Sequence, residues 1–431
     1  MKTKEEILDL IEDEGVEFIR LQFTDMFGNL KNLAVTPSQM ERVLNNKYSF
    51  EASDIFCGAI DPEDDLYLYP DLESFVILPW RPQQGKVGKF LCDVCLSDGT
   101  PFDMDSRVIL KEVLKKAEEK GYTFYVDPEC EFFLFHTDEN GNPTNNTHEM
   151  AGYMDVGPID FGENARRDMV LMLEEMGFEV EASHHEKAPG QHEIDFKEAE
   201  ALQIADSITT FRFAVRSIAK RFGLYATFMP KPKTNYAGSG MHLNVSLYKD
   251  GKNLFRNPDS DDNISDVARY FMGGVMSHAK ALCAITNPTV NSYKRILSGF
   301  EAPSDISWTN RGENALLKVK NSFGDMKVEL RFPDSSANPY LSLAVCIAAG
   351  IEGIEQKINP GESINGHRNN NAVKLPDNLK EAVIAMKNDS FMEQILSKRF
   401  VKTYTDAKLN EWNDYMLQVS DWEVNKYLYR M

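Results

Sequence analysis

The chain has 431 residues and a formal net charge of −20, and it is 42% hydrophobic and 26% charged. This length and composition indicate a globular protein of two domains and exclude a disordered or fibrous chain. The acidic balance argues against direct binding to nucleic acid, because a phosphate backbone requires a basic surface.

The first hundred residues predict a small unit of helix and sheet. Residues 5–12 have the periodicity of a helix, and a turn around Gly28 separates the first two predicted strands. The strand-like segments are residues 16–23, 30–35, 74–79 and 88–95. A turn-rich segment at residues 97–101 marks a boundary, so we expect one domain over residues 1–100 and a second over residues 101–431.

Beyond this boundary, helices alternate with mainly antiparallel strands, so the predicted fold class is α+β. The helical segments include residues 106–121, 164–176 and 208–222. Gly223, directly after the third segment, is a typical residue at the end of a helix. A polar loop follows Gly361 and includes residues 368–371, and the remainder is predicted to be helical.

Neither a signal peptide nor a membrane span is predicted. The N-terminal residues are charged and lead into an amphipathic pattern without an apolar core and cleavage site. The longest apolar stretch, residues 340–354, is shorter than a membrane-spanning helix. We therefore expect a cytoplasmic protein without a membrane partner.

Six cysteines are scattered along the chain, and Cys92 and Cys95 form a C-x-x-C motif. Such a motif occurs in redox and zinc sites, but this one lies in a predicted strand, where an odd spacing directs the thiols to opposite faces. A second cysteine pair that would complete a zinc site is absent from the sequence. We therefore expect core cysteines and no disulfide framework.

Several predicted strands are apolar on one face and polar or charged on the other. Residues two apart share a face, because side chains alternate along a strand. The polar faces carry Glu129 with Glu131, His242 with Asn244 and Ser246, and Lys327 with Glu329 and Arg331. Glu186 and Glu193 flank a segment in which Pro189 and Gly190 break regular structure, so that the chain can fold back and bring both carboxylates together.

Each polar face alone is most simply explained by contact with solvent, since antiparallel sheets often have one wet face. Together they favour convergence on one cavity, which would hold five carboxylates and one imidazole. Like charges at this density are unfavourable without cations, and carboxylate-rich sites without thiolates suit Mg²⁺ or Mn²⁺. Two divalent cations nearly balance five negative charges, so the pattern predicts a two-metal site.

A second set of residues is suited to binding anions. Arg295, Arg311 and Lys318 are the basic members, although such residues are usually solvated on a protein surface. Residues 238–240, Gly-Ser-Gly, are either a simple turn or a place where backbone approaches a ligand. The sequence contains no Walker loop or dinucleotide fingerprint, so metals and these cations would have to hold the phosphates of a bound nucleotide.

Six longer runs are more specific than any single motif. They are residues 18–25 (FIRLQFTD), 67–71 (YLYPD), 183–193 (SHHEKAPGQHE), 238–242 (GSGMH), 287–295 (NPTVNSYKR) and 336–340 (SANPY). Together they resemble the type I glutamine synthetases of the short form, over nearly the whole chain. The resemblance implies a β-grasp-like N-terminal domain and a larger catalytic domain built on a curved antiparallel sheet with helices.

The implied reaction joins ammonia to the γ-carboxylate of glutamate. ATP phosphorylates that carboxylate, and ammonia attacks the γ-glutamyl phosphate to give glutamine, ADP and phosphate. The resemblance also implies a homo-oligomer, a dodecamer of two stacked hexamers, with active sites between neighbouring subunits.

The resemblance further implies roles for individual residues. One Mg²⁺ or Mn²⁺ ion is expected on Glu131, Glu186 and Glu193, and a second on Glu129, His242 and Glu329. The residues implied in glutamate binding are Gly238, Arg295, Glu301 and Arg331. Those implied in ATP binding are Glu181, Asn244, Ser246, Arg311 and Lys318. Those implied in catalysis are Glu51 at the amine, Glu301 on a flap that keeps water from the acyl phosphate, and Arg311 at the phosphates.

Several positions depart from the family pattern. Glu51 stands where the family has an aspartate in its ammonium-binding loop, and Asp54 replaces a serine there. Lys318 and Lys327 replace arginines, which keeps the charge but loses the bidentate fork. Ile60 stands where some members use an arginine for feedback control.

These departures leave the acceptor open. The main hypothesis is an ammonia-dependent ligase, and the runner-up is a γ-glutamyl ligase for an organic amine such as a polyamine, ethanolamine or methylamine. A regulatory homologue without turnover is a third possibility, which retention of the six implied metal ligands and Glu301 disfavours. The sequence leaves undecided the choice of Mg²⁺ or Mn²⁺, feedback by glutamine, and any regulatory protein partner.

Overall fold

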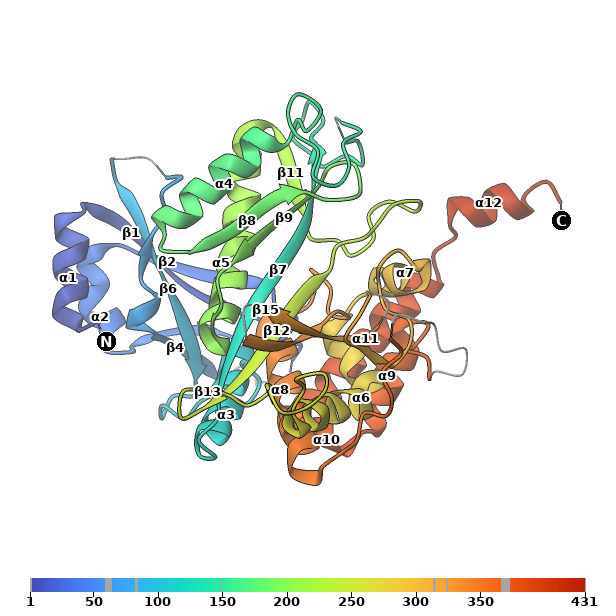
Figure 1. The fold of residues 1–431 in the computed structure, drawn as a ribbon. Coiled ribbons are helices and arrows are strands. Elements are labelled where there is room, and N and C mark those ends of the chain that lie inside the picture. The colour runs from blue at the N-terminus through green and yellow to red at the C-terminus, as the bar shows by residue number, and fades with distance from the viewer. Residues whose placement is uncertain are drawn as a thin grey trace.

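The computed structural model contains two β-sheets with helices packed around them (Figure 1). The described residues are 2–58, 64–81, 84–147, 149–312, 315–322, 325–365 and 373–430. Ile60 and the predicted polar loop at 368–371 lie outside these residues. In the part of the chain that is described, none of the helices combines the length and the apolar composition needed to cross a membrane.

The N-terminal sheet has the strand order β2-β1-β6-β4-β3, with the short β5 beside β6. Its strands are β1 (Val16–Thr24), β2 (Leu30–Val35), β3 (Tyr48–Glu51), β4 (Asp65–Pro70), β5 (Val76–Ile77) and β6 (Lys86–Cys95). β1 and β6 are parallel, and the other pairs are antiparallel. Helix α1 (Lys4–Asp13) is started by a capping box of Thr3 and Glu6.

The sequence predicts most of this unit. The predicted helix and the predicted strands that became β1, β2 and β6 are confirmed, and Cys92 and Cys95 lie buried on β6 as free thiols. The predicted strand at 74–79 is wrong in extent. The Asp71 side chain accepts a hydrogen bond from the Glu73 amide and starts a 3₁₀ turn, η2 (Leu72–Ser74), so that strand pairing is confined to β5. Strands β3 and β4 were not predicted.

The second sheet has the order β14-β15-β16-β12-β7-β9-β8, and its pairs are antiparallel except for β14 with β15. Its strands along this path are β7 (Thr123–His136), β8 (Val180–His185), β9 (Gln191–Phe196), β12 (Met241–Lys249), β14 (Trp308–Thr309), β15 (Leu317–Ser322) and β16 (Asp325–Leu330). Short strands at its margins are β10 (Ala199–Glu200), β11 (Leu224–Thr227) and β13 (Lys252–Asn253). The predicted α+β class with a mainly antiparallel second sheet is confirmed.

Helix α2 (Met40–Leu44) packs against β4 of the N-terminal sheet. The other helices cover the second sheet or form the C-terminal part. They are α3 (Ser106–Glu118), α4 (Glu163–Glu175), α5 (Ala201–Ala219), α6 (Asp266–Thr286), α7 (Val290–Ser298), α8 (Pro339–Gln356), α9 (Leu379–Asn388), α10 (Ser390–Leu396), α11 (Lys398–Met416) and α12 (Asp421–Tyr427). The prediction for α5 began seven residues late, at 208. The helix starts earlier because Ala201, Ile204 and Ala205 continue its buried face.

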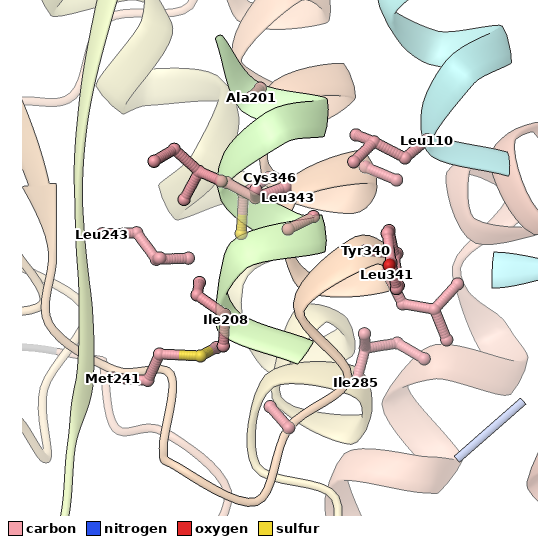
Figure 2. Packing of buried hydrophobic residues seen from close by; sticks show 14 of the residues in the cluster. Leu110, Ala201, Ile208, Met241, Leu243, Ile285, Tyr340, Leu341, Leu343 and Cys346 are labelled. Carbon is pink, nitrogen blue, oxygen red and sulfur yellow. The ribbon is translucent and has the colours of Figure 1, made fainter. Parts of the chain in front are cut away.

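The core lies between α5, α8 and the inner face of the second sheet (Figure 2). Ile208 of α5 faces Met241 and Leu243 of β12, and residues of α8 such as Leu343 and Cys346 complete the cluster. These side chains are 1% exposed or less. This packing makes one face of β12 apolar, which leaves the opposite face of the strand for polar residues.

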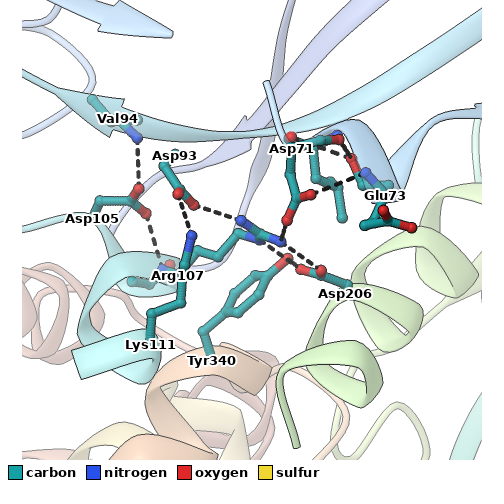
Figure 3. A network of polar contacts seen from close by, with 12 residues as sticks. Asp71, Glu73, Asp93, Val94, Asp105, Arg107, Lys111, Asp206 and Tyr340 are labelled. Atoms are coloured by element: carbon teal, nitrogen blue, oxygen red, sulfur yellow. Dashed lines mark hydrogen bonds and ion pairs between the residues drawn. The ribbon is translucent and has the colours of Figure 1, made fainter. Parts of the chain in front are cut away.

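Arg107 joins the N-terminal sheet to the helices (Figure 3). Its guanidinium lies 2.6 Å from Asp71, 2.5 Å from Asp93 and 2.8 Å from Asp206 of α5. The Tyr340 hydroxyl donates to Asp206 over 2.8 Å. Burial opposes the charge of Arg107, but Asp206 and Asp93 raise its pKa above the usual value. We call Arg107, Asp71, Asp93 and Asp206 the Arg107 cluster.

The C-terminal helix α12 lies apart from the body of the protein, at the end of an extended segment (Figure 1). Its surroundings expose large apolar side chains, including Leu417, Val419, Trp422, Leu428 and Tyr429. Apolar surface of this kind is typical of a segment that contacts another protein.

Candidate active site

A cavity of about 650 Å³ lies over the polar face of the second sheet. Strands β7, β8, β9, β12, β15 and β16 all contribute to its lining. The six side chains predicted to bind metal are among the residues that line it: Glu129, Glu131, Glu186, Glu193, His242 and Glu329. The structure therefore brings together residues that are spread over two hundred positions of the sequence.

Strand pairing explains this convergence. On β7, Glu131 lies opposite Glu193 of β9, and Glu129 lies opposite His242 of β12. Glu329 of β16 is one strand further along, opposite Asn244 of β12. Because paired residues in a sheet point to the same side, this register places the acidic side chains on one face.

The first acid cluster is Glu131, Glu186 and Glu193. Glu186 reaches it because its amide donates to the Gln191 carbonyl over 2.8 Å, which closes the turn between β8 and β9 around Gly190, at φ +75°. Glu131 accepts hydrogen bonds from the Gln191 side chain at 2.8 Å and the Gly240 amide at 3.0 Å. The Arg295 guanidinium is a basic group whose charge acts on Glu131.

Burial and the crowding of carboxylates dominate the electrostatics of this cluster. Burial raises the pKa of Glu193, and the charge of Glu131 raises it further. Burial likewise raises the pKa of Glu131, with Glu186 adding to the effect and the charge of Arg295 opposing it. Three buried carboxylates beside one arginine are a costly arrangement, which a bound divalent ion would relieve.

The second acid cluster is Glu129, His242 and Glu329. One potential ligand atom from each lies within 4.8 Å of the others. Here the chain supplies cations: Lys320 lies 2.6 Å from Glu129 and 3.4 Å from Glu329, and Arg331 lies 2.6 Å from Glu329. Although burial opposes it, hydrogen bonds from His242 and Lys320 lower the pKa of Glu129.

The donor sets of both clusters fit a hard divalent cation. Each consists of carboxylate oxygens, with one imidazole in the second cluster and no thiolate in either. Glu329 is fully buried, and its Oε2 atom has no hydrogen-bond partner beyond the ion pair with Lys320 at 3.4 Å. Buried oxygens in this condition are suited to coordination.

His184, Asp195 and Lys320 line the cavity and were not predicted as site residues from the sequence. Asp195 lies opposite Glu129, and His184, Glu193 and Asp195 form a further group of potential ligand atoms within 4.8 Å. Burial raises the pKa of Asp195, and Glu129 raises it further. Asp195 and Lys320 each lie two residues from a predicted site residue on the same strand, so the period-two pattern was the signal that would have identified them.

The residues expected to bind glutamate also line the cavity. Gly238 and Arg331 are among them, and Arg295 of α7 is 3% exposed and donates to the Phe332 carbonyl over 3.2 Å. A Cβ atom at Gly238 would lie 2.2 Å from the Pro230 carbonyl oxygen, so a larger residue would displace that backbone. Glu301 lies at the cavity with φ +58° and forms an ion pair with Lys187.

The residues expected at ATP are dispersed. Lys318 lines the cavity, whereas Asn244 donates to Glu129 over 3.1 Å and Ser246 donates to Glu198 over 3.1 Å. Glu181 and Arg311 are exposed and are not among the described residues that line the cavity. Lys327 also lies outside the lining and pairs with Asp127 at 3.2 Å and Glu198 at 2.8 Å.

Within a single chain, Glu51 lies outside the catalytic cavity. It is the last residue of β3 in the N-terminal sheet, it is exposed, and it accepts a hydrogen bond from Ser53 over 2.9 Å. It is not among the described residues that line the cavity.

This fold and site define an enzyme with a carboxylate-rich candidate metal centre on a curled sheet beside a smaller N-terminal sheet. Two family models match the chain: the glutamine synthetase β-grasp domain over residues 15–97, and the glutamine synthetase catalytic domain over residues 103–427. The chain belongs to the glutamine synthetase family.

Similar proteins agree with this assignment. The chain is 50% identical to a glutamine synthetase of Clostridium saccharobutylicum, and the alignment covers 99% of this chain and 98% of the relative. It is 45% identical to one of Staphylococcus epidermidis, with the same coverage. A solved structure of GmaS in complex with ADP has a TM-score of 0.89 and 32% identity, covering 98% of this chain and 99% of that one.

Proposed function

We propose that this protein joins ammonia to the γ-carboxylate of glutamate at the expense of ATP and releases glutamine, ADP and phosphate. The observation that carries the proposal is the single cavity in which two acid clusters lie beside Arg295 and Arg331. Acid clusters suit a metal-bound polyphosphate, and the arginines suit a carboxylate substrate. Full-length similarity to glutamine synthetases supports the same reaction.

The clusters would hold two Mg²⁺ or Mn²⁺ ions, one on Glu131, Glu186 and Glu193 and the other on Glu129, His242 and Glu329. When bound, such ions neutralise the charge of the transferring phosphoryl group. Arg331 and Arg295 would grip the carboxylates of glutamate, since a guanidinium forms two parallel hydrogen bonds to a carboxylate. Lys318 and Arg311 would bind the phosphates, with Glu181, Asn244 and Ser246 around the nucleotide.

The last step needs a base for the amine and a closed site. Glu301 would exclude water from the γ-glutamyl phosphate and accept a proton from the attacking amine. It is suited to this because it is half-buried at the cavity and forms an ion pair with Lys187. Gly238 would allow close approach of backbone to the substrate.

Glu51 would act from a neighbouring subunit in a homo-oligomer. Its exposed position, outside its own cavity, is the arrangement that a residue serving a neighbour's site requires. The exposed apolar side chains around α12 support assembly of several copies. The finer proposal is a cytoplasmic dodecamer of two stacked hexamers, in which residues 1–100 and 101–431 are separate domains.

The alternative acceptor is an organic amine, and Glu51 and Asp54 are the residues that favour it. The longer side chain of Glu51 shifts its carboxylate relative to an aspartate, and Asp54 is exposed in the same turn. Both changes would alter an amine pocket without affecting the acid clusters.

One experiment separates these functions. The release of ADP and of phosphate is measured with glutamate and each of ammonia, methylamine, ethanolamine and putrescine. We expect the highest kcat/KM with ammonia. A higher value with another amine would assign that amine instead, and no turnover with any of them would indicate a regulatory homologue.

A further inference from the structure

A second, larger cavity lies behind the catalytic one. Its volume is about 890 Å³, and its walls come from β1 and β2 of the N-terminal sheet, from α5 and from the start of α7. None of the residues assigned above to glutamate, ATP, metal or amine is among its described lining residues. The proposed reaction therefore does not account for it.

The charge of this second cavity is opposite to that of the protein as a whole. It is lined by Arg20, Arg212, Arg216 and Lys408, and Glu411 is the one acidic residue among its described lining residues. Glu411 lies 2.8 Å from Lys408 and neutralises it. The structure thus places three further cations at one cavity in a chain of net charge −20.

Among the described residues, no carboxylate lies within ion-pair distance of these three arginines. Aromatic rings orient them instead: Arg20 lies 5.6 Å from the Phe213 ring, and Arg212 and Arg216 lie 5.8 Å and 5.0 Å from the Phe228 ring. A ring orients a guanidinium without cancelling its charge. Arg212 and Arg216, one turn apart on α5, also repel each other.

Two buried polar groups in the cavity lack partners. Gln22 is 1% exposed, and its Oε1 atom has no hydrogen-bond partner. The buried Nε of Arg20 is in the same condition. Burial also lowers the pKa of Arg212 to about 10, which leaves it charged at neutral pH. An uncompensated cationic group beside unsatisfied polar atoms is expected to bind a polar ligand.

The second cavity shares walls with the catalytic cavity. Ser335 lines it, and the Ser335 hydroxyl lies 2.7 Å from the carbonyl oxygen of Glu131 and 2.6 Å from that of Gly240. Arg212 donates to the Ala337 carbonyl over 2.8 Å, in the loop that follows β16. Helix α7 presents its first turn to the second cavity and Arg295 to the catalytic one.

We propose that the second cavity is a regulatory binding site for a small oxyanion, a metabolite carrying carboxylate or phosphate groups. The ligand bridges Arg20, Arg212 and Arg216. Its binding alters the catalytic cavity through Ser335 and through α7. This coupling rests on the proposed ligase function, whereas the binding itself does not.

The binding test uses the full-length protein with Mg²⁺ at constant ionic strength. Inorganic phosphate and succinate are titrated by calorimetry into wild type and into the Arg212→Gln and Arg216→Gln variants. We expect at least tenfold weaker binding in both variants and wild-type binding in Arg221→Gln, a matched exposed arginine outside the cavity.

Tighter phosphate binding assigns a phosphorylated ligand, and tighter succinate binding assigns a dicarboxylate. Arg216 is exposed, so its substitution is expected to leave folding intact even if Arg212→Gln does not.

The coupling is tested by the KM for glutamate, which we expect a saturating anion to change at least twofold in wild type and not in Arg216→Gln. Three results would overturn the site. The first is that neither anion binds. The second is that binding survives in both arginine variants and is lost in Arg295→Gln, which places the anion in the catalytic cavity. The third is that Arg216→Gln dissociates the oligomer, which identifies the second cavity as a contact between copies. If the anion binds to wild type as expected but leaves the KM for glutamate unchanged, the coupling is overturned and the binding site is not. This conclusion is separate from the test of the ligase reaction itself.

Discussion

The Arg107 cluster and the first acid cluster both gather three carboxylates in the interior, yet their charges are balanced differently. At Arg107 the chain supplies the cations: the guanidinium contacts Asp71, Asp93 and Asp206, and Lys111 lies 2.5 Å from Asp93. At Glu131, Glu186 and Glu193 the charge of Arg295 acts on Glu131, but the three carboxylates outnumber it. The first arrangement is complete as folded and holds the N-terminal sheet to α5. The second is short of positive charge, which suits it to bind ions and a phosphorylated substrate.

The largest expected effect is on catalysis, from removing one carboxylate of the first acid cluster. Glu193→Gln should lower turnover at least about 10³-fold, or about 4 kcal/mol of transition-state stabilisation, because a metal ligand is lost. In the metal-free protein the same change should maintain or raise Tm, since burial and Glu131 disfavour an ionised carboxylate at this position. Glu200→Gln, an exposed control, should change neither property. A large fall in metal-free Tm for Glu193→Gln would mean that the cluster is structural.

At Arg107 we expect a loss of stability, in contrast to the loss of catalysis expected at Glu193. Arg107→Met leaves Asp71 and Asp206 without their arginine partner and Asp93 with Lys111 alone, and it should lower the free energy of unfolding by about 3 kcal/mol. Lys111→Met, on the same helix but with a side chain 41% exposed, should cost under about 1 kcal/mol. Thermal unfolding at equal protein concentration measures both. Equal stability of the two variants would contradict the role assigned to Arg107.

Lys89 extends the comparison of buried charges, because it is a buried cation beside the Arg107 cluster. Its ammonium donates a hydrogen bond to the Thr210 hydroxyl over 2.7 Å. Burial lowers its pKa from 10.5 to about 8. The unfolded chain therefore binds more protons between these values, and wild-type stability should rise with pH across that window. Lys89→Met should raise the free energy of unfolding by about 2 kcal/mol at pH 7, and the gain should vanish near pH 10.5. A gain independent of pH, seen in Tm measured at both ends, would argue that folding does not shift the pKa of Lys89.

The smallest effect is expected at a carboxylate outside both clusters. Glu51→Gln should reduce amine-dependent turnover about tenfold, or about 1.4 kcal/mol, while ATP affinity stays unchanged. The reason is that a carboxylate within reach of the amine assists its deprotonation. Steady-state kinetics with ammonia and each organic amine provide the measurement. Wild-type rates with all of them would remove Glu51 from the catalytic residues.

Local sequence patterns identify many polar residues of the site, but they do not identify the residues that strand pairing brings next to them. The alternation of Glu129 with Glu131 and the break at Pro189-Gly190 are local features, and both led to residues that line the cavity. Asp195 and Lys320 were missed because their relevance depends on strand register, which arises from contacts distant in sequence. The early start of α5 and the short β5 were missed for a related reason, since burial against other elements and a side-chain cap decided them.

The second cavity was beyond prediction for the same reason. Arg20 and Arg216 are ordinary basic residues in the sequence, and each belongs to an otherwise unremarkable strand or helix. Packing of the N-terminal sheet against α5 brings them to one cavity. Gly28, which also lines this cavity, allows the turn after β1 to approach α8, because a Cβ there would lie 2.9 Å from Asn338 at the start of α8.

The most direct test of the account is the number and position of divalent ions. Mn²⁺ is titrated into the metal-free protein and counted by electron paramagnetic resonance, and its sites are located by anomalous scattering in crystals. The account predicts two ions per chain, one within about 2.0–2.6 Å of oxygens of Glu131, Glu186 and Glu193, and one at a similar distance from Glu129, His242 and Glu329. A single ion, or ions bound away from these side chains, would contradict it.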